Sequence, residues 1–279
     1  MSGGTRLARD GQQLEARLAR GEIVSEPVAV VVAHPDDEIL WMGSRLGCLA
    51  RLRLIHITDG APRDMVDAHR AGLETWRQYA AARRLELYCA LKAIQAQPQQ
   101  YIAYDIADQE SAQQLVPIIE RLTAEISGMH AVITHSYEHG HPDHDSAALA
   151  VHAARAQLER KGELPPHLIE FASYHARDGR LCCGEFWSRP DVAEAVVSET
   201  ADSRESKRRA LDCFVSQRHV LQQFVPEHER LRPAPAYDFT QPAPPGQALY
   251  DAFGWKMTSP LWRTRARQTL QHLTLSGPL

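Results

Sequence analysis

The feature that most constrains the fold of this chain is an uninterrupted run of valine and alanine at residues 28–33. The run lacks the alternation of apolar and polar residues that a half-exposed strand shows, and it is typical of a strand buried on both faces of a parallel sheet. The sequence His34-Pro-Asp-Asp-Glu38 follows at once. A buried strand is therefore predicted to end in a loop that carries one imidazole and three carboxylates.

Strand and helix patterns alternate along the rest of the chain. Strands are predicted at residues 52–58, 101–106, 131–134 and 168–174, and helices at residues 39–51, 66–94, 111–126, 147–158 and 203–221. This order is the signature of an α/β protein with right-handed crossovers. We predict a Rossmann-like three-layer fold, with a mostly parallel sheet and helices on both faces.

The two ends of the chain are predicted to be extensions of one domain that spans residues 1–279. Residues 1–26 hold a short amphipathic helix at residues 6–20, and residues 232–279 hold a proline-rich arm and a C-terminal helix. Each proline removes a backbone donor, so the arm is predicted to be extended and neither helix interior nor central strand. The chain beyond residue 200 has too few apolar residues for a core of its own.

Composition excludes several classes of protein. Hydrophobic residues make up 44% of the chain and charged residues 24%, as in an average globular protein. The net charge is −4, and no basic stripe favours nucleic acid or a membrane surface. The N-terminus lacks the apolar stretch of a secretory signal. The five cysteines form no C-x-x-C pair, which predicts reduced structural thiols in a cytoplasmic protein.

Histidines and carboxylates gather after two of the predicted buried strands. The first loop is the one at residues 34–38; the second, after residues 131–134, holds four histidines within residues 135–144. Ligands of open parallel sheets bind beyond the carboxyl ends of the strands. The first loop has no glycine and three acids, so it would repel a phosphate and attract a cation. A dinucleotide site is therefore disfavoured.

One histidine and one carboxylate from the first loop, with one histidine from the second, would make a His₂Asp set. Three protein ligands with a fourth position open are typical of catalytic zinc. His34 and Asp37 can both point at one ion, which leaves Asp36 beside its water as a general base. The alternative is that each segment is only a turn, with an acid of the first loop capping the helix near Ile39 and Asp145 or Ser146 capping the helix near Ala147. Their joint placement at strand ends favours the metal site.

Ala33-His-Pro-Asp-Asp-Glu38 and Gly140-His-Pro-Asp-His144 resemble the two signature motifs of the PIG-L/LmbE-like family of zinc-dependent N-acetylglucosaminyl deacetylases. The resemblance covers residues 27–220 and includes Thr58-Asp-Gly60, Arg83-Arg-Leu-Glu86, Asp108-Gln109, Lys207-x-x-Ala210 and Ser216-Gln217. It implies hydrolysis of an N-acetyl group from an amino-sugar conjugate, with release of acetate and a free amine.

The resemblance also implies roles for individual residues. The metal ligands would be His34, Asp37 and His144, holding Zn²⁺ or another divalent ion such as Fe²⁺. Asp36 would be the base, His141 in its protonated form would stabilise the oxyanion or protonate the leaving amine, and Asp143 would orient a histidine.

Three further residues are predicted to bind substrate, namely Arg83, Asp108 and His139. For Arg83 the alternative is an ion pair on a helix surface with Glu86 or another nearby acid. Aromatic residues near the arm (Tyr237, Trp255 and Trp262) could stack on a sugar, but packing is favoured for them.

Two other functions use the same residues. A His₂-carboxylate set also occurs in non-haem iron oxygenases, although usually on a β-barrel. A non-catalytic carbohydrate-binding protein is the second alternative. The predicted partner is a small amino-sugar conjugate, without nucleic acid or membrane, and the chain is a possible homo-oligomer.

Overall fold

The computed structural model of the chain describes residues 14–224, 226–243 and 248–279. Its strands are β1 (Val24–Val32), β2 (Leu49–Thr58), β3 (Gln100–Ile106), β4 (Ala131–His135), β5 (His167–Phe171), β6 (Tyr174–Arg177), β7 (Arg180–Cys183), β8 (Ala195–Val196) and β9 (Arg230–Pro233). Its α-helices are α2 (Asp37–Leu46), α3 (Val66–Arg70), α4 (Trp76–Ala93), α5 (Leu115–Ile126), α6 (Pro142–Arg160), α7 (Ala201–Asp212), α8 (Arg218–Leu221) and α9 (Ser259–His272). Three 3₁₀ helices are η1 (Ser111–Gln113), η2 (Val215–Gln217) and η3 (Leu249–Phe253).

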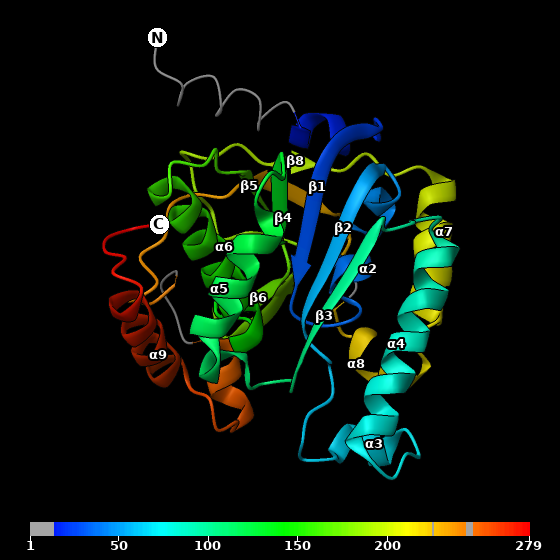
Figure 1. Cartoon of the computed structure of the whole chain (residues 1–279). Helices are drawn as coiled ribbons and strands as arrows, with labels where there is room; N and C mark the ends of the chain where they lie inside the picture. The colour runs from blue at the N-terminus through cyan, green and yellow to red at the C-terminus, as the bar shows by residue number, and fades with distance from the viewer. Residues whose placement is uncertain (1–13, 225, 244–247) are drawn as a thin grey trace.

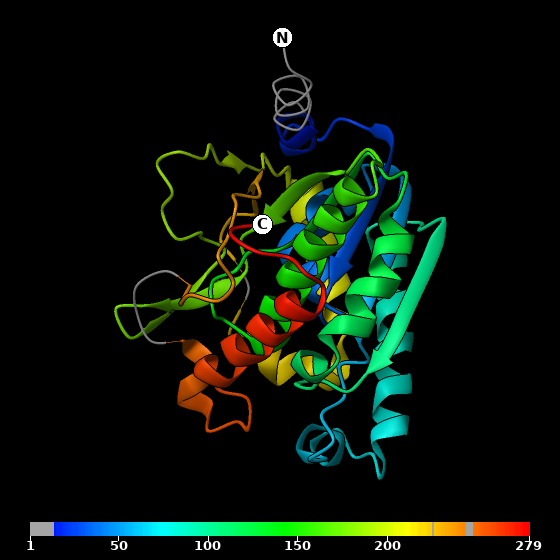
Figure 2. The same ribbon diagram turned by 60° about the vertical axis from the view of Figure 1, so that its left-hand side comes forward.

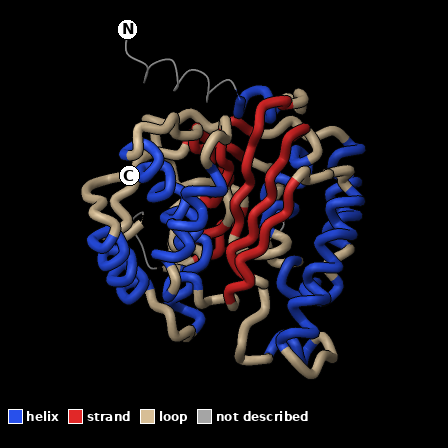
Figure 3. The backbone as a smooth tube through the Cα atoms, in the orientation of Figure 1, coloured by secondary structure: helices blue, strands red, loops and turns tan. Residues whose placement is uncertain are grey.

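The main sheet has the strand order β3-β2-β1-β4-β5-β9-β8 (Figures 1 and 3). Neighbours among β3, β2, β1, β4 and β5 are parallel, whereas β9 runs antiparallel to β5 and to β8. Strands β6 and β7 form a separate antiparallel pair. The predicted mostly parallel sheet is confirmed.

Helices cover both faces of this sheet. Along β1, Ala29 and Val31 join a hydrophobic cluster with α5, α6 and α9, whereas Val28 and Val30 join a second cluster with α2, α4 and α7. Successive residues of a strand point to opposite faces, so the valine run supplies both clusters. Figures 1 and 2 show the two helical layers on either side of the strands. The three-layer prediction is confirmed.

The C-terminal arm differs in part from its prediction. Arg232 and Pro233 lie in β9, between β5 and β8, and not in an arm outside the sheet. A proline is tolerated there because β8 pairs only with Arg230 and Leu231, so nothing on that side needs the missing N–H of Pro233. Tyr237 and Trp262 are buried in the hydrophobic cluster of α5, α6 and α9, which confirms packing for these two.

Several predicted helices have different bounds in the structure. The helix expected at residues 203–221 is interrupted, since α7 ends at Asp212 and is followed by η2 and α8. The helix expected at residues 39–51 ends at Leu46, because β2 already begins at Leu49. The helix expected at residues 66–94 is two helices, since α3 ends at Arg70 and α4 begins after Thr75, whose side chain forms a capping box with Gln78. The helix expected to begin near residue 147 begins at Pro142. The helix expected at residues 6–20 is observed at residues 14–19, and the rest of it lies outside the described residues. Among the described helices, none combines the length and apolar character needed to cross a membrane.

The prediction that all cysteines are reduced is wrong for two of them. Cys89 of α4 and Cys213, which follows α7, form a disulfide across 124 residues of sequence. Cys48, Cys182 and Cys183 are free. The pairing depends on the packing of α4 against α7, so the spacing of cysteines along the chain gave no sign of it.

Candidate active site

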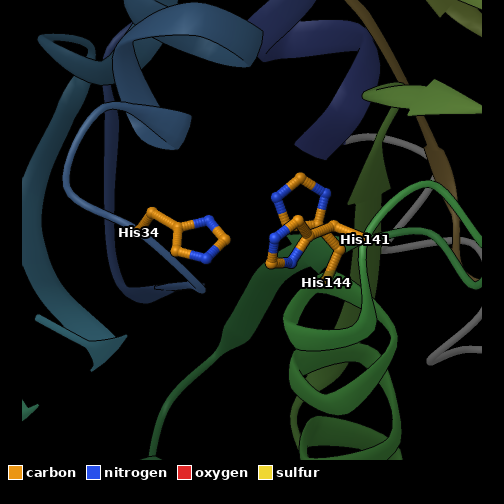
Figure 4. Close-up of side chains that lie close together, drawn as sticks. All are labelled: His34, His141 and His144. Carbon is orange, nitrogen blue, oxygen red and sulfur yellow. The ribbon is translucent and has the colours of Figure 1, made fainter. Parts of the chain in front are cut away.

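The histidine-rich segments meet at the point where the strand order of the sheet reverses. β1 lies between β2 and β4, so the chain leaves β1 towards α2 on one face and leaves β4 towards α6 on the other. Such a switch point opens a crevice at the carboxyl ends of the strands. Figure 4 shows His34, on the loop after β1, facing His141 and His144 at the start of α6.

Neither loop is merely a capping turn. Asp36 occupies the N-cap position of α2, but its side chain makes no capping hydrogen bond, and its φ of 151° is strained for a residue with a side chain. The N-cap of α6 is His141, whose Nδ1 accepts from the backbone N–H of Asp143. Strain of this kind concentrates at functional sites. The capping alternatives for these acids therefore do not hold.

The three predicted ligands lie at distances that suit one cation. The His34 Nδ1 atom is 3.3 Å from one carboxylate oxygen of Asp37, and the His144 Nε2 atom is 3.2 Å from the other. Donor atoms arranged tetrahedrally at about 2.0–2.1 Å from zinc are separated by roughly 3.3 Å. All three side chains are buried. Each histidine is therefore close enough to share a zinc ion with Asp37, although the two approach different oxygens of its carboxylate.

The structure also brings other potential ligands together. The ligand atoms of His34, His141 and His144 lie within 4.8 Å of one another, as do those of Asp37, His135 and His144. Asp108 and Asp143 form a further group with His34 and His141. The set of His34, Asp37 and His144 thus stays a prediction, with His141 and His135 as its nearest competitors.

His135 was part of the histidine cluster in the sequence, but no role was predicted for it. Its Nε2 accepts the backbone N–H of Ala33, 3.1 Å away, and its ring stacks on that of His144 at 3.9 Å. Trp41 was missed as well: its indole N–H donates to Asp37 at 3.1 Å. These contacts fix two of the predicted ligands before any metal binds.

Asp36, the predicted base, is held by Arg83. The guanidinium of Arg83 donates to Asp36 Oδ2 at 2.8 Å and to the backbone oxygens of Pro35 and Gly60. Burial raises the pKa of the Asp36 carboxyl to about 7, although the charge of Arg83 opposes the shift. Arg83 is only 2% exposed, and Glu86 instead accepts from Ser216. The alternative of an ion pair at the helix surface is therefore wrong in its location, since Arg83 is buried and its acidic partner is Asp36.

Asp143, which was predicted to orient a histidine, contacts His34. Its Oδ2 lies 3.2 Å from the His34 Nε2 atom and accepts the backbone N–H of Gln109, and its Oδ1 accepts from Ser111. Asp108 lies 3.2 Å from the same His34 nitrogen and 3.7 Å from the Nε2 atom of His141.

The tautomer of His141 follows from its backbone contact. Because its Nδ1 accepts a backbone N–H, the ring proton of the neutral form lies on Nε2. Burial, with the neighbouring His34, holds the pKa of His141 well below its ordinary value. In its neutral form the imidazole thus has Nε2–H as a donor, and the predicted protonated role stays a prediction.

His139 does not lie in the site, contrary to its predicted role in substrate binding. Its Nδ1 is 2.6 Å from Asp145, its Nε2 accepts the backbone N–H of Ala243, and its carbonyl oxygen accepts that of Leu249. His139 is absent from the residues that line the cavity over the predicted ligands. It anchors the C-terminal arm beside α6.

A cavity of about 380 Å³ lies over the predicted ligands. Its polar lining includes the predicted ligands and base, His141, the substrate-binding candidates Arg83 and Asp108, and also Gln217, whose side chain bonds to Tyr79. Trp255 lines the cavity with its ring 4.9 Å from that of His141. Trp255 is thus half-buried and borders the cavity, in contrast to the buried Tyr237 and Trp262.

Steric crowding explains why the second motif has a glycine at position 140. A Cβ atom at Gly140 would collide with the backbone oxygen of Tyr174, the first residue of β6. Tyr174 also lines the cavity, and its ring contacts that of His144 at 5.1 Å between centroids. Gly140 thus lets β6 approach the ligand loop.

Residues 29–155 match the family described as PIG-L: GlcNAc-PI de-N-acetylase. The resemblance to the PIG-L family is confirmed. The matched segment holds both motifs and all the predicted ligands. No curated protein sequence matches the chain.

Solved structures share the PIG-L-like fold. A zinc-inhibited form of teicoplanin deacetylase is 15% identical, covers 74% of this chain and 97% of its own, and has a TM-score of 0.55. The deacetylase of the A40926 pseudoaglycone is 16% identical, covers 75% and 97% of the two chains, and has a TM-score of 0.56. At sequence identities this low, the structural similarity establishes a shared fold only.

Proposed function

We propose that this chain is a metal-dependent N-deacetylase that removes an acetyl group from an amino-sugar conjugate of the N-acetylglucosamine type. The observation that carries the proposal is the convergence of His34, Asp37 and His144 beside the strained Asp36, at the floor of one cavity. The PIG-L match and the deacetylase names of the structural neighbours support the same activity.

His34, Asp37 and His144 would hold the ion, and zinc suits their donors. Zinc would supply a Lewis acid for the acetyl carbonyl and would make water more acidic at neutral pH. Each ligand has its own support: Trp41 donates to Asp37, His135 stacks on His144, and Asp143 contacts His34. Fixed ligands keep the substrate carbonyl in one place relative to the base.

Asp36 is the proposed base. It takes a proton from the water whose oxygen attacks the acetyl carbon, and Arg83 holds its carboxylate at 2.8 Å. The neutral His141 donates from Nε2–H to the carbonyl oxygen as charge develops there. When the C–N bond breaks, the proton held by Asp36 passes to the amine nitrogen, and acetate and a free amine leave.

The test is an assay for free primary amine released from a panel of N-acetylglucosamine conjugates. Zinc-loaded wild type should release amine, and both metal-stripped protein and the Asp36→Asn variant should lose activity by at least about 100-fold. Asp36→Asn should still bind one zinc per chain. No release from any conjugate by protein with zinc verified would reject the proposal and favour a non-catalytic carbohydrate-binding role.

Metal content separates the predicted ligand set from its competitors. His144→Ala should lose the metal, whereas His141→Ala should keep it and lose activity. Loss of metal from His141→Ala with retention in Asp37→Ala would replace Asp37 by His141 in the set. Metal analysis after purification with Fe²⁺ and with Zn²⁺ compares the two candidate ions.

A further inference from the structure

The lining of the cavity includes five apolar side chains that the deacetylation chemistry does not use. They are Val220 and Leu221 of α8, Phe224 just after that helix, and Phe253 and Trp255 at the end of η3 and beyond. We call these five side chains the apolar wall. They come from residues beyond 200, whereas both ligand motifs lie within residues 29–155.

The apolar wall runs from the predicted metal ligands to the surface. At its inner end, the ring of Phe224 packs on Tyr174 with centroids 4.4 Å apart, and Tyr174 contacts His144. On the other side Trp255 contacts His141, and Phe253 packs on Trp255 at 4.9 Å. Phe253 is 46% exposed. A group attached to the reacting sugar can therefore contact apolar side chains both next to the predicted ligands and at the exposed Phe253.

The charged groups of the cavity are unsuited to an anion. Asp36, Asp67 and Asp108 all line it. Within the described part of the chain, Arg83 is the one lysine or arginine in the lining, and it is already paired with Asp36. Away from the predicted metal ligands, a phosphate or carboxylate on the substrate would thus meet Asp67 and, among the described residues, no unpaired lysine or arginine.

We infer that the group joined to the amino sugar is uncharged and apolar, aryl or alkyl in character, and that it binds along the apolar wall. The inference rests on the proposed function and names the substrate class of the same site. An apolar group gains free energy from leaving water against Phe224 and Trp255. The carboxylates of Asp36, Asp67 and Asp108 in the same lining disfavour an anionic group.

Three substrates test the inference: the phenyl and methyl β-glycosides of N-acetylglucosamine, and N-acetylglucosamine 1-phosphate. The phenyl glycoside should have a kcat/KM at least about tenfold above that of the methyl glycoside. Phe224→Ala and Trp255→Ala should remove this advantage, measured as the phenyl-to-methyl ratio of kcat/KM within each variant. Tyr88→Ala, an exposed aromatic on α4 outside the cavity, is the matched control and should change neither substrate.

A binding measurement separates this inference from the proposed function. Phenyl β-glucosaminide, the amine product, should bind by calorimetry at least about tenfold more tightly than its methyl counterpart, with the advantage lost in Phe224→Ala. Equal binding of the two glycosides, or a kcat/KM for the 1-phosphate at or above that of the phenyl glycoside, overturns the inference. Preferential binding of the phenyl compound without deacetylation of any substrate sustains the apolar wall and rejects the proposed function.

Discussion

At the scale of single residues, the site depends on an aspartate held in a costly conformation. The φ of 151° at Asp36 turns its carboxylate away from capping α2 and towards Arg83. Strain of this kind costs about 1–3 kcal/mol and persists only where the surroundings enforce it. Here the enforcing contacts come from Arg83, which ties Asp36, Pro35 and Gly60 together. We therefore assign Arg83 a positioning role in addition to its place in the cavity lining.

Replacing Arg83 tests this role. Arg83→Gln should lower kcat by about 100-fold, because a base displaced by an ångström loses its alignment, while KM changes little. The matched control is Arg84→Gln, since Arg84 is the next residue of α4 and pairs with the exposed Asp105 at the surface. Steady-state kinetics on zinc-loaded variants measures both constants. An increase in KM at unchanged kcat would instead support the predicted contact of Arg83 with substrate.

The sequence predicted the residues of the site better than their contacts. His34, Asp36, Asp37 and His144 converge because both motifs follow buried neighbouring strands, which the sequence makes visible. The prediction that His139 binds substrate failed because His139 lies in the loop between β4 and His141 and has a left-handed φ of 57°. Its ring is directed towards the arm, where it accepts the backbone N–H of Ala243. Trp41 and His135 act through tertiary contacts that no spacing reveals.

At the scale of elements, the C-terminal arm is fastened to α6 through His139 and Asp145. Tyr250 of η3 donates to Asp145 at 3.1 Å, and the backbone N–H groups of Ala243 and Leu249 bond to His139. The side chains of His139, Asp145 and Tyr250 are all buried. Loss of His139 would leave the Asp145 carboxylate and the Ala243 N–H short of partners in a dry environment.

We expect His139→Ala to lower the free energy of unfolding by about 1–3 kcal/mol, the cost of orphaned buried polar groups. Its KM for an N-acetylglucosamine conjugate should stay within about twofold of wild type. Asp108→Asn, which changes a group lining the cavity, is the comparison and should raise KM. Urea unfolding and kinetics together measure the effects, and a large KM change without loss of stability in His139→Ala would restore its predicted role in binding substrate.

The disulfide between Cys89 and Cys213 gives a second test at this scale. It joins α4, which bears Arg83, to the end of α7, and closes a loop of 124 residues. A crosslink of this length should stabilise the chain by about 2–4 kcal/mol through the unfolded state.

Alkylation of unreduced, denatured protein should modify three of the five cysteines, as mass spectrometry can count. Cys213→Ser should lower the unfolding free energy, whereas Cys48→Ser, at a free cysteine, should change it little. Five modified cysteines in protein purified without reductant would show that the two thiols are not linked.

Elements with strong local signals were predicted well, and the errors have local causes. The strands of the parallel sheet were found because their apolar runs are unbroken. The break between α3 and α4 was overlooked although Thr75 and Gln78 carry a capping box in the sequence. The early start of α6 was missed because Pro142 was taken for a turn residue, whereas proline suits the first turn of a helix.

At the scale of the whole molecule, the C-terminal segment packs into the same hydrophobic cluster as the sheet, which supports the predicted single domain. His152 of α6 lies at this junction. Its Nδ1 contacts the backbone oxygen of Leu279 at 3.2 Å, and its ring packs against Tyr237 and Phe239. Burial lowers the pKa of His152 to about 4, compared with about 6.5 in an unfolded chain.

The stability of the fold should therefore fall with acidification. Since the folded pKa of His152 is the lower one, its neutral form contributes stability that is complete above pH 6.5 and is lost as pH falls towards 4. In this window the unfolding free energy should drop by up to about 1.4 kcal/mol per pH unit through this group. His152→Gln should show a shallower slope between pH 6.5 and 4.5 in urea titrations. Parallel slopes for the two proteins would rule out His152 as the source.

The apolar wall and the ligand motifs lie in separate stretches of the chain. The family match ends at residue 155, and the wall begins at Val220. Substitutions in α8 and η3 can therefore alter which compound is accepted while the machinery that breaks the amide bond is left intact. If the proposed apolar subsite is correct, substrate preference can change through residues 220–279, and exchange of this segment between relatives should alter selectivity.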